Sequence, residues 1–536
     1  MKKLKLVCVA IAMAGAAPTF AGGLLTNTNQ HVAFNRMMSR EASIGIDGVY
    51  YNPAGVVFMG EGHHLAINWQ LAYQTRTINN DYKLFTNNVN NPITPRDFKG
   101  KAFAPVIPSF QYAYNKGKWS FQANFSLTGG GGKCTFDDGL GSFEKIVSET
   151  AIAACGLAGV VDKTLGNKLG QPGMELFSSD QAFGKTGKYS FNSYMHGRQY
   201  YYGLSAGAAY KFCDNFSAFL GVRGVYALTN YYGYVENINV GNMPLYKVLD
   251  PTKENAANIE LSCDQTGVGF TPIIGVDYKT GRWNFSAKYE FKTRIRLKNK
   301  SVNQTPSIGN LPANLANQMT GILTARYQQA GLPLEQAKQQ AESTTNAVLN
   351  DPTVGATMMG LKTQFDQKLN KAIGEYEDGK KIAGDIPGYL ALGIGYSPVD
   401  AVRVNVGFHW FDDKNATSYN NRNKELKRGT LEYNAGVEVD VNKKITLSTG
   451  WQNTNYGLSD EYMDDKSFVV GSNSAAIGGV YHINKKMDLN VAYFHTFYQH
   501  KKTSETVQLA ADNSIVYNSD YTRNNNVFAV GLDINF

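Results

Sequence analysis

Long segments in which apolar and polar residues alternate strictly are the feature that most limits how this chain can fold. In residues 119–127 every odd position is apolar and every even position is polar, and the same period returns in 283–291, 402–410 and 431–440. A period of two is that of a β-strand with two different faces. Each segment runs to about nine residues or more, whereas strands of soluble sheets usually have five or six. That length suits a tilted strand that crosses a bilayer with its apolar face toward lipid.

Alternation alone also fits a soluble sandwich, and three further features favour a membrane barrel. Short turns alternate with long polar connections, which is typical of barrels with short turns at one end and long loops at the other. Aromatic residues such as Tyr201, Tyr231 and Phe497 lie near strand ends, where interface girdles form. The last segment, 527–536, alternates and ends in Phe536, which resembles the signal read by the barrel-assembly machinery.

The pattern predicts an all-β fold, a transmembrane antiparallel barrel of about fourteen strands, an even number as single-chain bacterial barrels require. The expected strands are 63–78, 102–115, 118–129, 196–211, 215–231, 266–279, 282–297, 385–397, 401–413, 430–441, 444–457, 472–484, 486–500 and 524–536.

The first residues predict export. Lys2, Lys3 and Lys5 precede an apolar run from 6 to 17, and Ala21 offers a small residue at the cleavage position. We therefore expect a signal peptide over 1–21. The net charge of +8 is spread over small groups of lysines in turns, and such spreading gives no nucleic-acid footprint.

A compact segment, 41–59, resembles neither the signal nor the strands. Its glycines allow close backbone approach, and Asn52-Pro53 is a turn pair. Its apolar residues need burial, yet some twenty residues cannot form a core alone. We expect a plug enclosed by the barrel, against the alternative of an ordinary lead-in to the first strand.

Two outer loops, 130–195 and 299–383, carry apolar residues at helical spacing. Their apolar stripes must pack on one another or on something that arrives from outside.

The chain after the signal peptide contains Cys134, Cys155, Cys213 and Cys263, none at metal-ligand spacing. The predicted topology puts Cys213 in a turn at the opposite end from the others, and we expect Cys134 and Cys155 to form a disulfide within one loop.

The plug motif Asn52, Pro53, Ala54 and Gly55, followed by this barrel, its helical loops and the terminal Phe536, resembles the FadL/TodX (OMPP1) family of outer-membrane transporters for long-chain fatty acids and other hydrophobic compounds. The resemblance covers the mature chain. It implies a hatch over 22–60 within a barrel over 61–536, in the outer membrane of a Gram-negative bacterium.

The resemblance also implies a path for the ligand. The family first takes its ligand into a groove of outer-loop helices, which corresponds here to 130–195 and 299–383. It then passes the ligand to an inner pocket touched by the N-terminal segment. A kink in the third strand opens the wall sideways, and here that strand runs into Gly129, Gly130, Gly131 and Gly132. This chain is longer than expected of the family, mainly in 299–383.

An apolar ligand prefers a dry pocket, since exposure to water costs about 0.8 kcal/mol per methylene. We expect that pocket where plug meets wall, lined by Leu24, Leu25, Phe34, Met37 and Met38, although these residues could equally anchor the plug. Charged residues of both signs on the lumen face, such as Lys288, Glu290, Arg403 and Glu438, should hold the plug by salt bridges.

The sequence thus predicts uptake of hydrophobic molecules by a monomer whose partners are outer-membrane lipid, the ligand and the assembly machinery. No spacing of serine and histidine selects a catalytic trio, so we expect no enzyme and no cofactor. The rival hypothesis is a surface adhesin or structural barrel that acts through its long loops.

Overall fold

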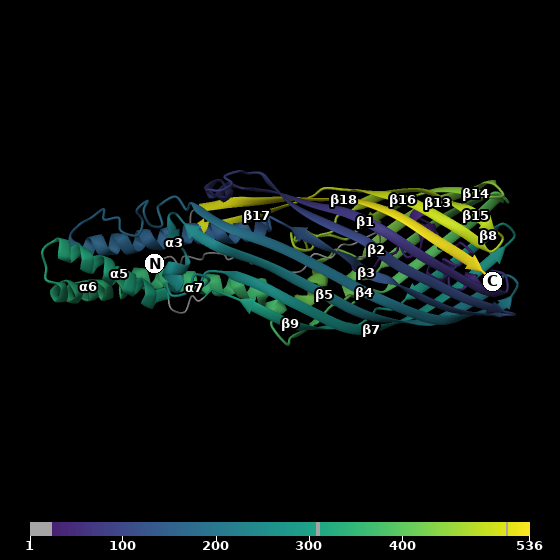
Figure 1. The fold of residues 1–536 in the computed structure, drawn as a ribbon, viewed down its shortest axis with the longest axis horizontal. Helices are drawn as coiled ribbons and strands as arrows, with labels where there is room; N and C mark the ends of the chain where they lie inside the picture. The colour runs from purple at the N-terminus through teal and green to yellow at the C-terminus, as the bar shows by residue number, and fades with distance from the viewer. Residues whose placement is uncertain (1–23, 307–310, 511–512) are drawn as a thin grey trace.

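The computed structural model describes residues 24–306, 311–510 and 513–536. The predicted signal peptide 1–21 and the first two residues of the predicted hatch lie outside these ranges. Long antiparallel strands form a closed barrel, and a bundle of helices extends from one of its ends (Figure 1).

Eighteen strand segments share one sheet. They are β1 Gly62–Tyr82, β2 Arg96–Lys116, β3 Trp119–Phe136, β4 Tyr189–Cys213, β5 Phe216–Val240, β6 Met243–Pro244, β7 Ile259–Thr280, β8 Trp283–Glu290, β9 Arg296–Gln304, β10 Lys381–Ala383, β11 Tyr389–Val399, β12 Val402–Phe411, β13 Thr430–Asn442, β14 Ile445–Asn455, β15 Ser472–Asn484, β16 Met487–Tyr498, β17 Lys501–Ala510 and β18 Asn513–Asn535.

Fourteen wall strands result when the interrupted ones are joined. β8 and β9 form one wall strand, since both pair with β7. β10 and β11 form the next one, because they pair with β9 and β8 respectively. β16 and β17 form a third, since both pair with β18. The two-residue β6 is a side branch of β5. β1 closes the ring against β18, from the pair His64 and Asn535 to the pair Tyr82 and Tyr517. The predicted fourteen-stranded antiparallel barrel is confirmed.

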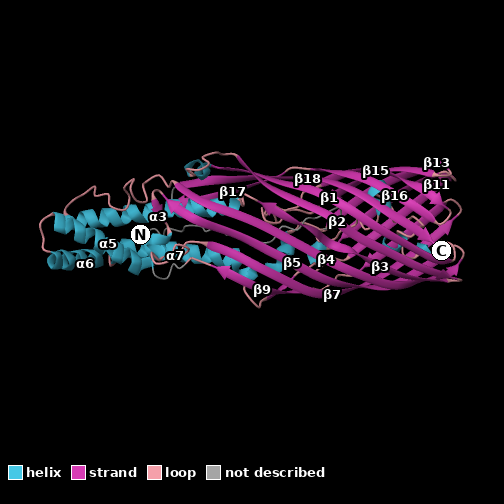
Figure 2. Ribbon diagram, in the orientation of Figure 1, coloured by secondary structure: helices cyan, strands magenta, loops and turns pink. Residues whose placement is uncertain are grey.

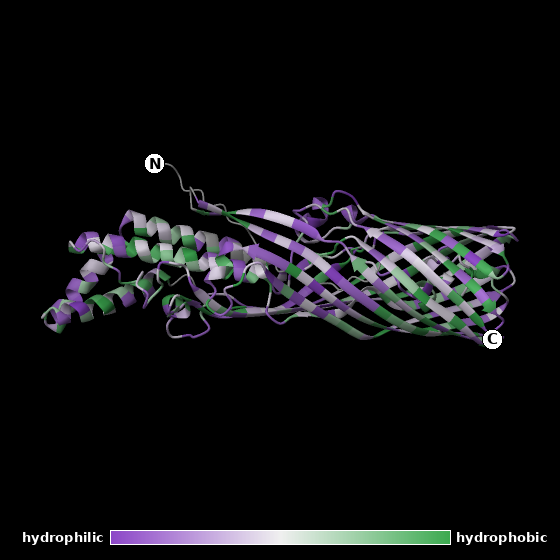
Figure 3. Ribbon diagram, turned by 90° about the horizontal axis from the view of Figure 1, so that it is seen from above, coloured by the Kyte–Doolittle hydropathy of each residue, from purple (hydrophilic) through white to green (hydrophobic). Residues whose placement is uncertain are grey.

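The alternation seen in the sequence becomes the two faces of the wall. On β1, Ile67 and Trp69 are about two-fifths exposed, whereas their neighbours Asn68 and Gln70 are buried. Apolar residues gather on the half of the barrel that carries the C-terminus, and the half beside the helices is more polar (Figure 3).

Several strands are longer at the helical end than their alternation predicted. β4 and β5 each have 25 residues, and β17, Lys501–Ala510, was not expected as a strand. These parts lie beyond the apolar half, so their outer faces need no apolar residues and carry no clean alternation. β3 is also longer than predicted, and the glycines 129–132 lie within it instead of at a loop entrance.

The helices lie mainly at the end away from the short turns (Figure 2). The long ones are α3 Gly141–Leu169, α5 Leu311–Gln329, α6 Leu334–Leu349 and α7 Pro352–Ile373, and the short ones there are η2 Lys83–Asn87, α4 Tyr246–Leu249, η4 Gly374–Tyr376, η5 Asp413–Asn415 and η6 Tyr419–Glu425. Buried apolar residues of the four long helices share one cluster, which includes Phe143, Leu165, Met319 and Val354. No helix within the described ranges combines the length and the apolar character needed to cross a bilayer.

The N-terminal segment, residues 24–60, contains α1 Val32–Met37, α2 Gly48–Tyr51 and η1 Gly55–Phe58. Nearly all of it is buried, and its polar groups bond to the inward-facing side chains of the wall, such as Asn68, Gln111 and Gln122. The segment therefore lies inside the barrel.

Candidate functional site

An apolar cleft of about 1320 Å³ lies among the helices at the outer end. One face of α3 and one face of α7 form its long walls, and residues of β5, α4, α5 and β17 complete it. Its lining includes Phe143, Val147, Ala154, Gly156, Val161, Val235, Ile238, Leu249, Leu315, Met359, Leu361 and Leu509.

Among the described side chains, two charged ones line the cleft, and both are already paired. Glu149 accepts a hydrogen bond from Tyr82 and pairs with Lys145, while Lys362 pairs with Asp366. An apolar molecule placed here would contact apolar side chains on most sides. Its binding would not require the desolvation of an unpaired charge. A volume above the usual range of roughly 300–1,000 Å³ leaves room for a long or branched ligand.

A second, mixed cavity of about 350 Å³ lies deeper, where the barrel meets the helices. Leu24 and Leu25 line it, with Tyr201, Leu297 and Ile382 of the wall on the other side. Glu375 of η4 also lines it, and burial raises the pKa of this carboxyl to about 7, against the opposing charges of Lys466 and Arg422.

The barrel wall is interrupted between β2 and β3. The two strands pair from Lys116 with Trp119 to Phe110 with Phe125, and they pair again from Phe103 with Lys133. Between these points, residues 104–109 of β2 and 126–132 of β3 form no ladder with each other. The side chains of Phe103, Val106 and Phe110 are 42–61% exposed on the outer face, so the interruption lies within the apolar band.

The sequence explains this interruption locally. Pro105 and Pro108 have no backbone N–H to donate to a ladder, and Gly130 and Gly131 have φ angles of 69° and 125° that few other residues adopt. The indole of Trp69 donates a hydrogen bond to the carbonyl oxygen of Pro105 over 2.9 Å. The wall is thus shaped to leave β2 and β3 apart at this level.

The N-terminal segment covers the interruption from inside. The backbone N–H of Asn27 donates to the carbonyl of Thr128 over 2.9 Å, and its side chain donates to the carbonyls of Leu127 and Gly130. Gln30 donates to Leu127 over 2.9 Å. These bonds satisfy carbonyl groups of β3 that β2 leaves unpaired. We call residues 27–30 and their bonds to β3 the latch.

The carbonyl of Gln30 ties the latch to β2. It accepts hydrogen bonds from Ser109 over 2.7 Å and from Gln111 over 3.0 Å. The latch therefore spans from β3 to β2 and occupies the position of missing ladder bonds.

An apolar cluster lies directly behind the latch. It joins residues of the N-terminal segment with residues of the interrupted wall: Phe34, Met38, Tyr50, Tyr51, Ala104, Ile107 and Leu127. Phe34 and Tyr51 stack with their ring centroids 5.2 Å apart. Tyr51 also donates from its hydroxyl to the carbonyl of Thr28 over 2.6 Å, which couples the cluster to the latch.

The motif Asn52 to Gly55 fastens the other end of the segment to the wall. Asn52 donates to Asp277 over 2.6 Å and accepts from the N–H of Gly55 over 3.1 Å. The carbonyl of Pro53 accepts from Gln122, and that of Ala54 accepts from Ser217, each over 2.7 Å. The motif is thus a structural anchor, because its side-chain amide and the carbonyls of Pro53 and Ala54 bond to three strands of the wall.

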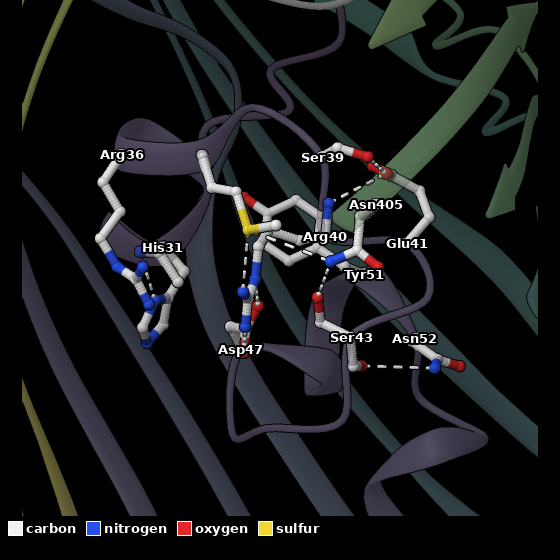
Figure 4. A network of polar contacts seen from close by, with 12 residues as sticks. His31, Arg36, Ser39, Arg40, Glu41, Ser43, Asp47, Tyr51, Asn52 and Asn405 are labelled. Atoms are coloured by element: carbon white, nitrogen blue, oxygen red, sulfur yellow. Dashed lines mark hydrogen bonds and ion pairs between the residues drawn. The ribbon is translucent and has the colours of Figure 1, made fainter. Parts of the chain in front are cut away.

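Buried charges hold the middle of the segment. Arg40 binds Asp47 through two hydrogen bonds of 2.7 and 3.0 Å (Figure 4), and Arg36 pairs with Glu438 of the wall. Glu41 lies 2.7 Å from His409, which also contacts Glu432 over 2.9 Å. Of the four lumen charges expected to hold the plug by salt bridges, Glu438 does so, and Lys288 donates a hydrogen bond to the carbonyl of Tyr50. Glu290 and Arg403 form their ion pairs with other residues of the wall.

The five residues predicted to line a ligand pocket separate into two groups. Leu24 and Leu25 line the mixed inner cavity. Phe34 and Met38 belong to the apolar cluster behind the latch, and Met37 is buried with its carbonyl close to Gly436 and Gly450. Gly129 to Gly132 lie at the interruption, where Gly129 comes close to Leu25.

The sequence analysis did not identify Pro105 and Pro108, although two prolines within one alternating strand indicate a break in its hydrogen-bonded ladder.

The predicted bond between Cys134 and Cys155 is wrong. All four cysteines in the described ranges are free. Cys134 lies on β3, seven residues before α3 begins, whereas Cys155 lies fourteen residues into that helix. Fourteen helical residues extend about 21 Å, so a regular helix of this length carries Cys155 far from the strand.

No family model and no curated protein matches the sequence. Solved structures match in fold. A Pseudomonas aeruginosa FadL homologue has 13% sequence identity and a TM-score of 0.57, over 96% of this chain and 100% of that one. A TodX deltaS2S3 mutant, a monoaromatic hydrocarbon channel, has 13% identity and a TM-score of 0.50, over 94% and 98% of the two chains. The Ralstonia pickettii toluene transporter TbuX has 12% identity and a TM-score of 0.45, over 92% and 94%. The predicted resemblance is confirmed at the level of the fold.

Proposed function

We propose that this chain, which has the fold of a FadL homologue, is an outer-membrane transporter that takes up hydrophobic molecules. The observation that carries the proposal is the interrupted ladder between β2 and β3, covered from inside by the latch. A wall that opens toward lipid serves a molecule that prefers lipid to water, and it would serve a hydrophilic one poorly.

Capture takes place in the cleft between α3 and α7. Its lining is mostly apolar, the two charges among its described side chains are paired, and it stands at the end of the barrel that carries the long loops. Each methylene that leaves water for such a surface contributes about 0.8 kcal/mol. A chain of a dozen methylenes would gain enough to be held from dilute solution.

Transfer then leads inward past Leu24 and Leu25. These residues stand at the inner cavity, and the latch begins two residues later. A ligand that moves Leu25 also strains the hydrogen bonds of Asn27, since the chain between them is short. Binding at the cavity and release of the latch are thereby coupled, and the N-terminal segment serves as a hatch.

Release goes sideways between β2 and β3 into the bilayer. The apolar cluster behind the latch continues through Ile107 and Leu127 to the outer face, where Val106 is 61% exposed. The ligand so avoids the charged lumen formed by Arg40, Asp47 and Glu438. No energy source is needed, because partition into lipid drives the step.

Long-chain fatty acids are the substrate class we propose to test first, with monoaromatic hydrocarbons as the competing class. Cells that lack a transporter of this kind would express the chain, and uptake of labelled oleate, toluene and a hydrophilic sugar would be compared. Molecules that remain bound after gentle extraction would be identified by mass spectrometry. Oleate uptake above the empty-vector level, with no sugar uptake, supports the proposal.

A surface adhesin is the alternative, and the same experiment separates the two. An intact barrel, shown to be folded by heat-modifiable gel mobility, that carries no apolar molecule and raises no uptake would contradict transport. Deletion of residues 22–60 supplies a further test, since a barrel without its hatch should conduct ions better in planar bilayers. Unchanged conductance in a folded deletion variant would count against a gating role.

A further inference from the structure

A group of cations lies on the outer face of the barrel directly above its apolar band. On β2 the last exposed aromatic residue is Phe103, and Lys101 follows it on the same face. On β4, Tyr202 and Tyr200 are followed by Arg198, and on β3 the same level is taken by Lys133. We call Lys101, Lys133 and Arg198 the basic patch.

Two of these cations face each other across the ladder. Lys133 is the direct partner of Arg198, and its partner on the other side is Phe103. Lys101 lies diagonally from Lys133, two residues from Phe103. Like charges directly opposite each other in adjacent strands are unfavourable, so the patch has a positive potential that an anion would relieve.

The chain itself supplies no such anion in the described ranges. Neither Lys133 nor Arg198 forms an ion pair with any described carboxylate, and Nε of Arg198 is buried without a hydrogen-bond partner.

Some cations elsewhere on the outer rim lie beside a carboxylate. Lys300 on β9 lies directly opposite Asp264 on β7, and Arg296 pairs with Asp385 over 2.9 Å. Lys298, between these two cations on β9, is instead the direct partner of Lys381 on β10, so facing cations also occur elsewhere on the rim. The basic patch differs in its place, because it borders the interruption between β2 and β3.

We propose that the basic patch binds the phosphate groups of a phosphorylated glycolipid in the outer leaflet. A lipid is the fitting occupant because the face below the patch is apolar: its acyl chains would lie along Phe103, Val106 and Phe110 while its phosphate meets Lys133 and Arg198. This inference rests on the proposed location in an outer membrane.

The place of the patch gives such a lipid a role at the exit. The pair of Phe103 and Lys133 is the first ladder pair beyond the interruption between β2 and β3. A lipid headgroup held there bridges β3 and β4 at the upper end of the opening, and its acyl chains cover the opening from outside. The latch inside and the lipid outside would then border the same gap.

Binding of bisphosphorylated lipid A to the purified full chain tests this. Titrations followed by native mass spectrometry would compare it with lipid A from which both phosphates have been removed. The variant Lys133→Gln with Arg198→Gln removes the facing cations. Arg296→Gln with Lys300→Gln is the matched control, since these two cations lie beside Asp385 and Asp264. Heat-modifiable mobility would show that both variants are folded.

We expect the wild-type chain to bind the phosphorylated lipid about tenfold more tightly than the dephosphorylated one, the difference that one to two lysines or arginines make at an anionic surface. The K133Q/R198Q variant should lose this preference, and the control should keep it. Equal binding of both lipids by the wild type, or equal loss in the control, overturns the proposal. Displacement of the lipid by excess inorganic phosphate would make the patch a site for free anions and overturn the lipid assignment. Because no transported ligand is present, failure here and failure of uptake are separate results.

Discussion

The side-chain amide of Asn27 donates a hydrogen bond to the backbone carbonyl of Gly130 over 2.7 Å, although the two residues lie 103 positions apart. One partner belongs to the N-terminal segment and the other to an interrupted strand of the wall. The bond is therefore present only when the N-terminal segment lies against β3. Its loss would accompany the proposed passage of ligand from the inner cavity to the gap between β2 and β3.

Replacing Asn27 by alanine should loosen the latch. The change removes the side-chain donor of the Gly130 carbonyl, whereas the Leu127 carbonyl keeps its bond from Gln30. A buried group without its partner costs about 1–3 kcal/mol. Hydrogen exchange should show faster exchange at the backbone amide of residue 27, which bonds to Thr128. Asn79→Ala is the control, since Asn79 makes a bond of 2.7 Å to Asp97 on the exposed surface. Equal acceleration in both variants would contradict a latch.

Gly129→Ala should unseat the N-terminal segment by sterics. A Cβ at this position would come within 2.3 Å of the carbonyl oxygen of Leu25, and backbone cannot yield as a side chain does. Overpacking of this kind costs about 1–3 kcal/mol, and we expect higher ion conductance in planar bilayers. At Gly60 an added Cβ meets nothing within 4 Å, so Gly60→Ala should conduct like the wild type.

Filling the outer cleft should impair capture and leave the wall intact. Gly156 lines the cleft and has no neighbour within 4 Å of an added Cβ, so Gly156→Trp would place an indole in the cavity. We expect the KM of uptake to rise about tenfold with little change in kcat, which corresponds to roughly 1.4 kcal/mol of lost ligand binding. Gly321→Trp on α5 offers the same change outside the cleft lining. An unaltered KM in Gly156→Trp would remove the cleft from the path.

Acidity should stabilise the loop around Glu375. Its pKa is raised by burial to about 7 from an ordinary value of 4.5, so the unfolded loop releases this proton at a lower pH than the folded loop does. The free energy of local unfolding should therefore fall as pH rises from about 4.5 to 7 and then level off. Hydrogen exchange of residues 374–383 would show this, and Glu375→Gln should abolish it. Glu377, whose side chain is 72% exposed, is the control position.

Thiol labelling should find the four described cysteines free. Alkylation of denatured protein without a reductant should modify Cys134 and Cys155 in full, because β3 and α3 hold them apart. A linked peptide pair in non-reducing maps would contradict this placement.

The barrel was predictable because each wall strand carries its own signal. In β8 the alternation from Trp283 to Glu290 predicts both the strand and its two faces, and this prediction needs no knowledge of distant contacts. Where strands rise beyond the apolar band, as in residues 501–510, water meets the outer face and polar residues are tolerated on both sides. The alternation fades there, and β17 could not be foreseen.

The site was less predictable, since it depends on contacts between distant residues. Leu24 and Leu25 were expected at a pocket and do line one, yet nothing local tells that Asn27 would meet β3. The disulfide failed for a similar reason: proximity along the loop suggested a pair, and the length of α3 decided otherwise. Pro105 and Pro108 did indicate a weak point in a strand. Their part in the site, however, depends on the backbone carbonyls of β3 on the other side of the gap, which sequence alone does not place there.

The length of β4 and β5 sets the height of the helices above the membrane. Strands of 25 residues, at roughly 3.3 Å per residue and a tilt near 40°, rise about 60 Å, while the apolar band needs about 25 Å. The helices therefore stand well clear of the membrane, at a height where a sugar coat would otherwise bury them. The proposed capture cleft would share that height, and α5 and α6, which lie at the far end of the helical bundle, would be the first elements that a large particle outside the cell reaches (Figure 1).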